Sequence, residues 1–504
     1  MTTAIRILPL ALLVVAGGCR VTIPAPAKSD PARPLELVVD ARRPGPRISP
    51  RLFGTNLEPN AEVSGLVIER ARGLGVTTYR FPGGGSPGWR WRTGALDRAP
   101  EMSPCPLARI EGLQRFLSRA AGAAVMQLNI ETGTPEEAAG LLRWMRDPAH
   151  PIRGDYFEVG NEPYGDWDAA YRSPEAYAET VQQHAAALRA VDPRVKIGAL
   201  LGGPYYDLDL KPDGVDTAGW DRRVLERAAE VIDFVSVHWY PGVRRRENPL
   251  HVMGNSLRIP SLVERIRGLI ARHAPGRRER IEIGFLEWDG VFDQEQTGLR
   301  HSLANAIFYA DALMQMARAR VALANQYELH SHSYGLLVGY DACMKDVPHM
   351  RKRYRRFDGA RVRPKALALQ LAAQMAGGAL LGTRLEGGAS YRTTTSRPAD
   401  EHQGAVPYWA AYAARHRDRI TLLVISRHPS RAARMRIRLR GFVPRGTADL
   451  RVLEGPSLRA TNEEQAGTVS IRRRTVEAGP GFAVAIPPAS LTLIELRRSI
   501  PARF

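Results

Sequence analysis

Lysine is scarce in this sequence of 504 residues: six lysines stand among 71 basic residues, and all the others are arginines. The chain still carries a formal net charge of +19 at pH 7. Such a charge is typical either of a surface that binds polyanions or of a composition biased toward arginine throughout. Arginine and alanine are frequent along the whole chain, so we favour the second interpretation.

Motifs for nucleotides, metals and nucleic acids are absent too. No GxGxxG follows the first predicted strand, and there is no phosphate-binding P-loop. The chain has three cysteines, no CxxC pair and no spacing typical of zinc ligands. No nucleic-acid reader motif accompanies the positive charge. We therefore expect no metal, no cofactor and no nucleic-acid partner.

Long hydrophobic runs are also missing, since no segment has 18 uninterrupted apolar residues. Residues 1–19 instead contain a positive Arg6, a short apolar run from Ile7 to Val15, and small residues ahead of Cys19. This pattern resembles a bacterial lipoprotein signal, which implies lipidation of Cys19 after cleavage. Ala16 replaces the usual leucine, so plain secretion stays open. We expect an exported protein of the bacterial cell envelope, held to the membrane only by this anchor, or a secreted one.

Export bears on the two other cysteines, Cys105 and Cys343. An oxidising compartment permits a disulfide between them, but the sequence equally allows two buried thiols. Residues 20–34, rich in proline and alanine, are typical of a tether between the anchor and a folded body.

A regular alternation of β-type and helical segments fills residues 48–375. Helical patterns begin near Pro135, Pro174 and Pro260, as helices with proline in their first turn do. The predicted strands are 52–58, 77–81, 124–130, 156–161, 195–200, 232–239, 281–287 and 321–327. Eight strands with intervening helices predict an α/β fold, a (β/α)8 TIM barrel, although a doubly wound sheet gives the same alternation.

The C-terminal part follows another rhythm. Short extended segments such as RITLLVISRH and ARMRIRLRGF alternate apolar and polar residues between turns. We predict a C-terminal antiparallel β-sandwich domain made of residues 35–47 and 376–504. The chain thus divides into a signal, a tether and two folded domains.

Catalytic residues of a barrel gather at the carboxyl ends of its strands. Glu162 follows the fourth predicted strand and Glu287 ends the seventh. Two carboxylates across one barrel mouth suit retaining glycoside cleavage: one protonates the leaving oxygen and the other attacks the anomeric carbon. A single glutamate at a strand end is more often a salt-bridge or capping residue, but two such residues favour catalysis.

Other strand ends supply groups that could bind a sugar. Amide, imidazole and phenol groups hydrogen-bond sugar hydroxyls, and tryptophan stacks on a sugar ring. The candidates are Glu58, Arg80, Trp89, Asn129, Asn161, His238 and Tyr240. His238 also has a structural interpretation, and Arg80 could pair with Glu162 or Glu287, fitting better beside the nucleophile.

Five ordered motifs resemble those of glycoside hydrolase family 51, the α-L-arabinofuranosidases. They are RFPGG (80–84), LNIETGTPEEA (128–138), FEVGNEPYGDW (157–167), IDFVSVHWY (232–240) and GFLEWD (284–289). The resemblance implies that Glu162 is the acid/base and Glu287 the nucleophile. It also implies that Asn161 binds the 2-hydroxyl, and that Glu58, His238 and Tyr240 shape the subsite around the cleaved bond. The implied enzyme is exo-acting on a carbohydrate substrate.

The sequence departs from the family in three places. Gly85 stands where the family usually has asparagine, and Asp289 where it usually has asparagine after Glu-Trp. Residues 328–364 match no motif of the family, and they include the basic segment Arg351–Arg363. That segment is interpreted as a solvated loop or as a surface for an acidic polysaccharide or phospholipid.

Two alternatives to the arabinofuranosidase stay open. One is a related glycosidase of the same clan: an endoglucanase, a β-xylosidase or a glucuronidase. The other is a non-catalytic surface lipoprotein that binds glycans. The oligomeric state does not follow from the sequence.

Overall fold

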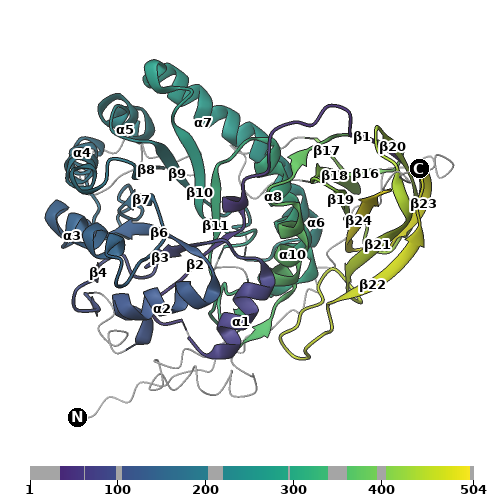
Figure 1. The fold of residues 1–504 in the computed structure, drawn as a ribbon, viewed down its shortest axis with the longest axis horizontal. Coiled ribbons are helices and arrows are strands. Elements are labelled where there is room, and N and C mark those ends of the chain that lie inside the picture. Colours follow the sequence, from purple (N-terminus) through teal and green to yellow (C-terminus); the bar gives the residue numbers. More distant parts are fainter. Residues whose placement is uncertain are drawn as a thin grey trace, which may run out of the picture.

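A barrel and a β-sandwich lie side by side in this computed structural model (Figure 1). The structure describes residues 35–61, 63–97, 105–202, 219–243, 245–292, 296–338, 360–393 and 404–499. The predicted signal with Cys19, the tether 20–34 and Cys343 lie outside the described residues, as does all of Arg351–Arg363 before residue 360. None of the helices in the described part combines the length and apolar character needed to cross a bilayer.

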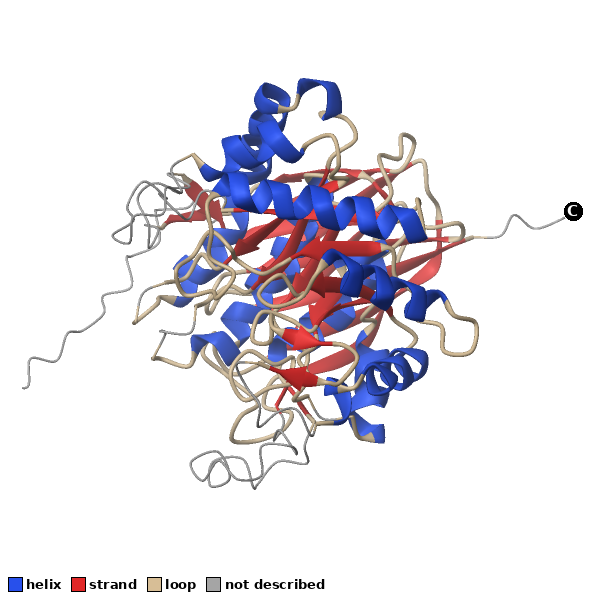
Figure 2. Cartoon of the chain, turned by 90° about the vertical axis from the view of Figure 1, so that its left-hand side faces the viewer, coloured by secondary structure: helices blue, strands red, loops and turns tan. Residues whose placement is uncertain are grey.

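Eight parallel strands close the barrel, one for each predicted strand. They are β2 (Gly54–Asn56), β3 (Thr78–Phe81), β6 (Ala123–Leu128), β7 (Tyr156–Val159), β8 (Lys196–Leu201), β9 (Phe234–Trp239), β10 (Glu282–Trp288) and β11 (Leu323–Gln326). β11 pairs with β2, so no edge remains. Helices and loops surround these strands (Figure 2). The predicted TIM barrel is thus confirmed, and the doubly wound alternative is wrong.

The helices around the barrel start where proline and capping residues place them. They are α1 (Gly65–Leu74), α2 (Ile110–Ala120), α3 (Pro135–Arg146), α4 (Pro174–Val191), α5 (Trp220–Ala228), α6 (Pro249–Gly254), α7 (Ile259–His273), α8 (Leu303–Arg318) and α10 (Pro364–Ala372). At α3 the Thr134 side chain accepts from the Glu137 amide, and the Glu137 carboxylate accepts from the Thr134 amide. This capping box satisfies two of the amides that a helix start leaves unpaired.

Two sheets form the sandwich. The smaller has the order β15-β1-β20-β23 and the larger β14-β18-β19-β24-β21-β22. The strands are β1 (Leu35–Asp40), β14 (Ala379–Leu380), β15 (Gly382–Glu386), β18 (Trp409–Arg415), β19 (Arg419–Ser426), β20 (Ala433–Arg440), β21 (Pro444–Glu454), β22 (Ser470–Glu477), β23 (Gly481–Ile486) and β24 (Ser490–Arg498). On β20, exposed arginines alternate with buried Met435, Ile437 and Leu439, which is the period of a half-buried strand. The predicted sandwich is confirmed, although β1 pairs in parallel with β20.

Three two-stranded ribbons complete the described strands. They are β4 (Trp89–Arg90) with β5 (Ala95–Leu96), β12 (Leu337–Val338) with β13 (Arg361–Val362), and β16 (Ser390–Arg392) with β17 (Ala405–Pro407). The ribbon of β12 and β13 brings residues 337 and 362 together. It therefore carries the start of the last barrel helix back toward the barrel mouth.

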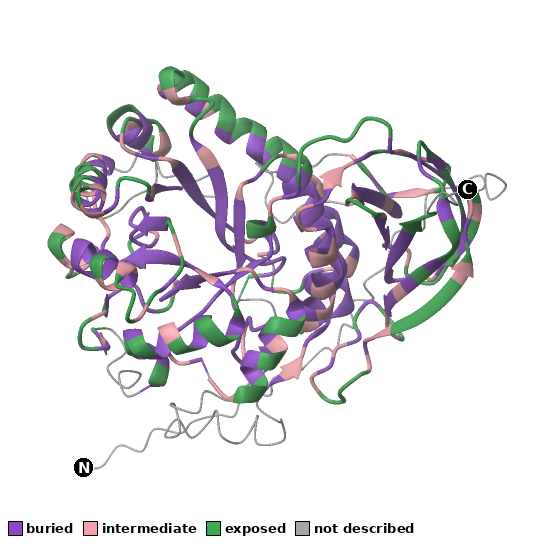
Figure 3. Cartoon of the chain, in the orientation of Figure 1, coloured by how far each residue is buried: buried purple, intermediate pink, exposed green. Residues whose placement is uncertain are grey.

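Helix α8 joins the two domains, because it is covered by the barrel on one side and by the sandwich on the other. All its residues except Arg318 are buried, which explains why its sequence is apolar around the whole helix (Figure 3). Leu313 of α8 and Leu422 of β19 belong to one continuous apolar core. Within it, Asp311 forms an ion pair with Arg427 of the sandwich, and both side chains are fully buried. The two domains are therefore packed as one body.

Candidate active site

A cavity of about 760 Å³ opens at the carboxyl ends of the barrel strands. This volume lies within the usual range for small-molecule sites. Its polar lining residues are Asn161, Glu162, Asp168, His238, Tyr240, Glu287, Glu328, His332 and Ser333, and its aromatic ones, Tyr240 apart, are Trp167, Phe292, Tyr327 and Tyr334. Polar groups that converge beside aromatic faces are the composition of a carbohydrate site.

Glu162 enters the cavity from the turn that ends β7. Gly160 has a φ of 87°, and a side chain there would place its Cβ 2.4 Å from Cδ1 of Ile130, so only glycine fits. Glu162 itself has a φ of 36°, an uncommon value for a residue with a side chain. Nδ1 of His238 lies 2.8 Å from Oε1 of Glu162, and Trp167 Nε1 donates to Oε2 at 2.7 Å.

Glu287 reaches the same cavity from β10. Tyr240 Oη donates to its Oε1 at 2.8 Å, and Arg80 Nη1 donates to its Oε2 at 3.2 Å. A Cβ on Gly84 would lie 2.3 Å from that Oε2, so the glycine turn after β3 lets the backbone approach the carboxylate. Glu287 is thus held by two donors, Arg80 of β3 and Tyr240 just after β9.

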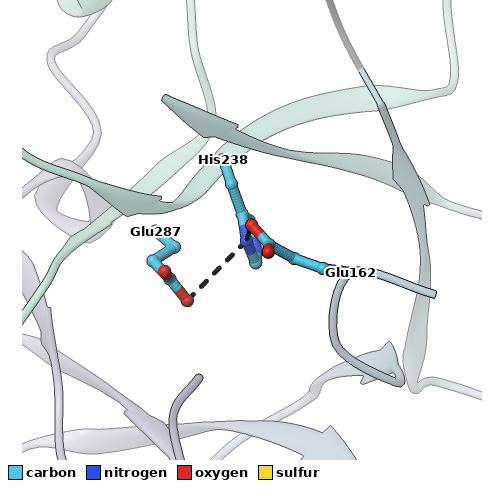
Figure 4. Close-up of side chains that lie close together, drawn as sticks. All are labelled: Glu162, His238 and Glu287. Atoms are coloured by element: carbon cyan, nitrogen blue, oxygen red, sulfur yellow. Dashed lines mark hydrogen bonds and ion pairs between the residues drawn. The ribbon is translucent and has the colours of Figure 1, made fainter. Parts of the chain in front are cut away.

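The separation of the two carboxylates decides which chemistry they can perform. One oxygen of Glu162, one of Glu287 and one ring nitrogen of His238 all lie within 4.8 Å of one another (Figure 4). Retaining glycosidases place their carboxyl groups about 5–5.5 Å apart, whereas inverting ones need about 6.5–9.5 Å to admit a water. The short separation therefore favours the retaining mechanism.

The same three side chains could also supply ligands to a cation, with two oxygens and one nitrogen. In this arrangement, however, the oxygens already accept hydrogen bonds from Trp167, Tyr240 and Arg80. A pair of carboxylates performs retaining hydrolysis without a metal. The expectation that no metal takes part stays a prediction.

His238 carries a positive charge between the carboxylates. Burial works against that charge, but the neighbouring Glu287, Glu158 and Glu162 raise the pKa of His238 to about 9. Burial likewise works against ionisation of Glu162, yet the contacts with His238 and Trp167 hold its pKa below the usual value. These contacts therefore favour the ionised form of Glu162.

Burial and the charge of Glu162 together raise the pKa of Glu287. The two carboxylates thus titrate as a pair in which the proton of one depends on the other. When the proton passes to Glu162, Glu287 loses its repelling neighbour and keeps Arg80, Tyr240 and His238, all of which favour its ionised form. The positions of these groups suit Glu287 as the nucleophile and Glu162 as the acid.

Arg80 lies beneath the cavity and not on its surface. Its side chain is fully buried, and it donates to Glu158 at 2.6 Å, to Asn56 and Asn161 at 2.8 Å each, and to Glu287. The structure therefore places Arg80 beside Glu287, as the sequence favoured, and also beside Glu158. It orients Asn161 and Glu287 and does not itself face a substrate.

Glu58 lies just behind the glycine turn. Its Oε1 accepts from the amide of Gly85 at 3.0 Å, and a Cβ on Gly83 would lie 2.3 Å from that oxygen. Burial and the charge of Glu287 raise the pKa of Glu58 to about 7, against the lowering effect of hydrogen bonds from Gly85 and Tyr327. Glu58 thus supports the cavity wall from behind.

Two predicted sugar-binding residues lie elsewhere. Trp89 is buried, packs edge-on against Phe81 and donates to the carbonyl of Ala108 at 2.6 Å. Asn129 organises a turn, in which its Oδ1 accepts from the amides of Glu131 and Thr132. Neither lines the cavity, because the chain turns away after β3 and β6, so the structure corrects their predicted place at the substrate.

Several residues of the site lack a strand-end signal. Trp167 follows Glu162 by five residues in the GDW sequence and is half exposed beside it. Glu158, inside β7, holds Arg80 and accepts from Ser236. The other polar and aromatic cavity residues that were not predicted are Asp168, Phe292, Tyr327, Glu328, His332, Ser333 and Tyr334. Of these, Tyr327 does end a predicted strand, 321–327. Trp167 could have been predicted as a site residue, because it is an aromatic residue close in sequence to Glu162.

The departure at Asp289 has a structural reason. Asp289 is fully buried, accepts from Asn305 at 2.8 Å and forms an ion pair with Lys365 of α10. It does not line the cavity, so a charge at this position serves an internal contact. Gly85, in contrast, does line the cavity, where a Cβ would lie 3.3 Å from the Tyr327 hydroxyl.

The chain is similar to known proteins over nearly its whole length. No protein-family model matches it. An exo-α-(1→6)-L-arabinofuranosidase of Bifidobacterium longum is 24% identical over 534 aligned residues, which cover 92% of this chain and 97% of that protein. An intracellular exo-α-(1→5)-L-arabinofuranosidase of Streptomyces lividans is 26% identical over 237 residues, 38% of this chain and 35% of that protein.

Solved structures show the same fold. An α-L-arabinofuranosidase from Thermotoga maritima, in a complex with arabinose, superposes with a TM-score of 0.73 and 21% identity, covering 92% of this chain and all of that one. A xyloglucanase of glycoside hydrolase family 44 from Paenibacillus polymyxa follows with a TM-score of 0.62 and 13% identity over 92% of this chain. The fold and the resemblance drawn from the motifs are thereby confirmed.

Proposed function

We propose that this chain is a retaining, exo-acting α-L-arabinofuranosidase of glycoside hydrolase family 51. The observation that carries the proposal is the pair Glu162 and Glu287, with oxygens within 4.8 Å in a cavity of carbohydrate-binding composition. Full-length similarity to an exo-acting arabinofuranosidase supports the sugar and the mode of attack. A glycan-binding protein without activity has no need of two carboxylates at this distance.

The reaction has two displacements. An oxygen of Glu287 attacks the anomeric carbon while Glu162 gives its proton to the leaving glycosidic oxygen, so a glycosyl ester forms and the alcohol departs. Water then attacks the same carbon, Glu162 takes a proton from it, and the ester bond to Glu287 breaks. Trp167 touches the acid and is exposed at the cavity mouth, so we place the leaving group on its side.

A panel of four aryl glycosides tests the sugar: α-L-arabinofuranoside, β-xyloside, β-glucoside and β-glucuronide. We expect the arabinofuranoside to be cleaved with the highest kcat/KM. Proton NMR at early times should show the sugar released with the anomeric configuration of the substrate. Preferred cleavage of another glycoside would replace the arabinofuranosidase with the related clan enzyme, and inversion would exclude the mechanism.

The place of the enzyme in the cell is a further part of the proposal. The pattern of residues 1–19 supports export and a lipid anchor at Cys19. Expressed in a bacterium with its signal, the chain should enter the membrane fraction and incorporate radiolabelled fatty acid. Cys19→Ser should lose both properties. Label incorporation by the serine variant, or a wild-type chain without label, would contradict the anchor.

A further inference from the structure

One wall of the cavity is a loop outside every family motif. Residues 331–335 follow β11, and three of them, His332, Ser333 and Tyr334, line the cavity. The Tyr334 ring lies 5.7 Å from that of Tyr240, which holds Glu287. The position of this loop therefore affects the space beside the nucleophile.

Arg363 holds the loop by its backbone. The guanidinium donates to the carbonyl oxygens of His332 at 2.7 Å, Gly335 at 2.9 Å and Ser331 at 3.2 Å. The side chain of Arg363 is fully buried, so these bonds are shielded from water. Arg363 thus holds the backbone of the loop at three of its residues.

The partner of Arg363 comes from the other domain. Glu463, in the loop between β21 and β22 of the sandwich, places Oε1 2.8 Å from Nε and Oε2 3.3 Å from Nη2 of Arg363. This two-pronged contact is the strong form of an arginine–carboxylate pair. Next to it, Arg361 donates to the carbonyl of Glu463 at 2.9 Å, and Asn462 donates to the carbonyl of Val362 at 3.0 Å.

We propose that the β-sandwich is part of the substrate-binding machinery, because Glu463 orients Arg363, and Arg363 positions loop 331–335 against the bound sugar. This inference rests on the proposed function of the cavity. Glu463 and Arg363 are positioning residues: Arg363 lies behind the loop and Glu463 behind Arg363, and neither lines the cavity. Glu162 lies in the turn after β7 and Glu287 in β10, and their hydrogen bonds run to barrel residues such as His238 and Arg80.

The same contacts explain part of the basic segment Arg351–Arg363. In its described residues, Arg361 and Arg363 both bind the sandwich loop at Asn462 and Glu463. These two arginines therefore serve contacts within the chain and not an acidic polymer.

The decisive variant is Glu463→Gln, which keeps the size of the side chain and removes its charge. We expect KM for the aryl arabinofuranoside to rise about tenfold and kcat to change less than about twofold, because the wall is displaced and the catalytic pair is not. Glu454→Gln is the matched control: Glu454 also belongs to the sandwich and is half-buried, but it pairs with Arg472 at 3.1 Å, at the end of β21 opposite Ser470 of β22. The control should keep the wild-type KM.

Two further measurements separate positioning from general stability. Arg363→Lys keeps the charge but cannot make the two-pronged contact and three carbonyl bonds together, so it should resemble Glu463→Gln. Hydrogen–deuterium exchange should show faster uptake in peptides covering 331–335 in both variants, and unchanged uptake in β7 and β10. Unchanged KM and unchanged uptake in Glu463→Gln would overturn the proposal, as would a fall in kcat that matches a loss of folded protein.

The exchange measurement also keeps this inference apart from the proposed function. If the wild-type enzyme cleaves none of the four glycosides, the proposed function fails. Increased uptake at 331–335 in Glu463→Gln would then still support the control of the loop by the sandwich, and unchanged uptake would reject it.

Discussion

Two sides of the same cavity are held in place by different means. On one side, His238 and Glu287 stand in β9 and β10, where hydrogen bonds between barrel strands fix them. Glu162 follows β7 in a turn, and its carboxylate contacts His238 and Trp167. On the other side, Ser333 and Tyr334 lie on a loop that two arginines hold. Arg363 donates to its backbone carbonyls, and Arg300 donates to the Ser333 hydroxyl at 2.7 Å and stacks on the Tyr334 ring.

The difference separates two tasks. Catalysis needs reacting groups that are positioned to within a fraction of an ångström, and the rigid strands of a closed barrel can position them so precisely. Recognition of a particular sugar changes between enzymes of one fold, and loops at the barrel mouth can change without disturbing the strands. We therefore expect changes on the strand side to act on kcat and changes on the loop side to act on KM.

The largest effect is expected for Glu287→Gln. An amide cannot attack the anomeric carbon, so kcat should fall by more than about 10⁴-fold. Covalent labelling by a fluorinated arabinofuranosyl substrate, followed by mass spectrometry, should mark Glu287 in the wild type and nothing in the variant. Label on another residue would show that the nucleophile lies elsewhere.

Glu162→Ala should lose less activity than Glu287→Gln. The variant lacks the acid, so kcat/KM should fall by about 10²–10⁴-fold for substrates with poor leaving groups. Substrates with very good leaving groups form the ester without the acid, and added azide should restore their turnover by replacing water. Equal losses for all leaving groups would mean that Glu162 is not the acid.

The charge of His238 makes the stability of the fold depend on pH. Its pKa is about 9 in the folded protein and about 6.5 in an unfolded chain. A raised pKa means that the imidazolium stabilises the fold fully below pH 6.5, and that this contribution is lost as pH rises to about 9. Denaturant unfolding should show the wild type losing on the order of 2–3 kcal/mol over this interval relative to His238→Gln. Parallel pH profiles of the two proteins would contradict the charged His238.

The fold and the convergence of the two carboxylates could be predicted from sequence because their signals are local. The barrel strands are short, mostly apolar runs, and polar residues closely follow some of them, such as β7 at 156–159. Several connecting helices carry their own start signal, such as the capping box of α3. Parallel strands bring their carboxyl ends to one edge, so Glu162, His238 and Glu287 could be placed together without any tertiary information.

The supporting residues could not be predicted because their partners are distant in sequence. Arg363 and Glu463 are 100 residues apart, and nothing in either neighbourhood marks the other. The prediction that Trp89 and Asn129 bind the sugar was wrong for a different reason. A residue beyond a strand end faces the cavity only if the loop carries it there. In both cases a turn or a core contact fixes the side chain instead. The residues on the loop side of the cavity are therefore the hardest to predict from the sequence.

The smallest effect is expected on that loop side, for Tyr334→Leu. The ring of Tyr334 packs against Tyr240 and Tyr327, and its removal loosens the wall without touching Glu162 or Glu287. KM for the aryl arabinofuranoside should rise by about three- to tenfold, the equivalent of one aromatic contact, while kcat stays within about twofold. Tyr334→Phe keeps the ring and should keep most of the affinity, which separates the packing of the ring from any bond of the hydroxyl. A kcat loss in Tyr334→Leu as large as that of Glu162→Ala would mean that the two sides of the cavity do not have separate tasks.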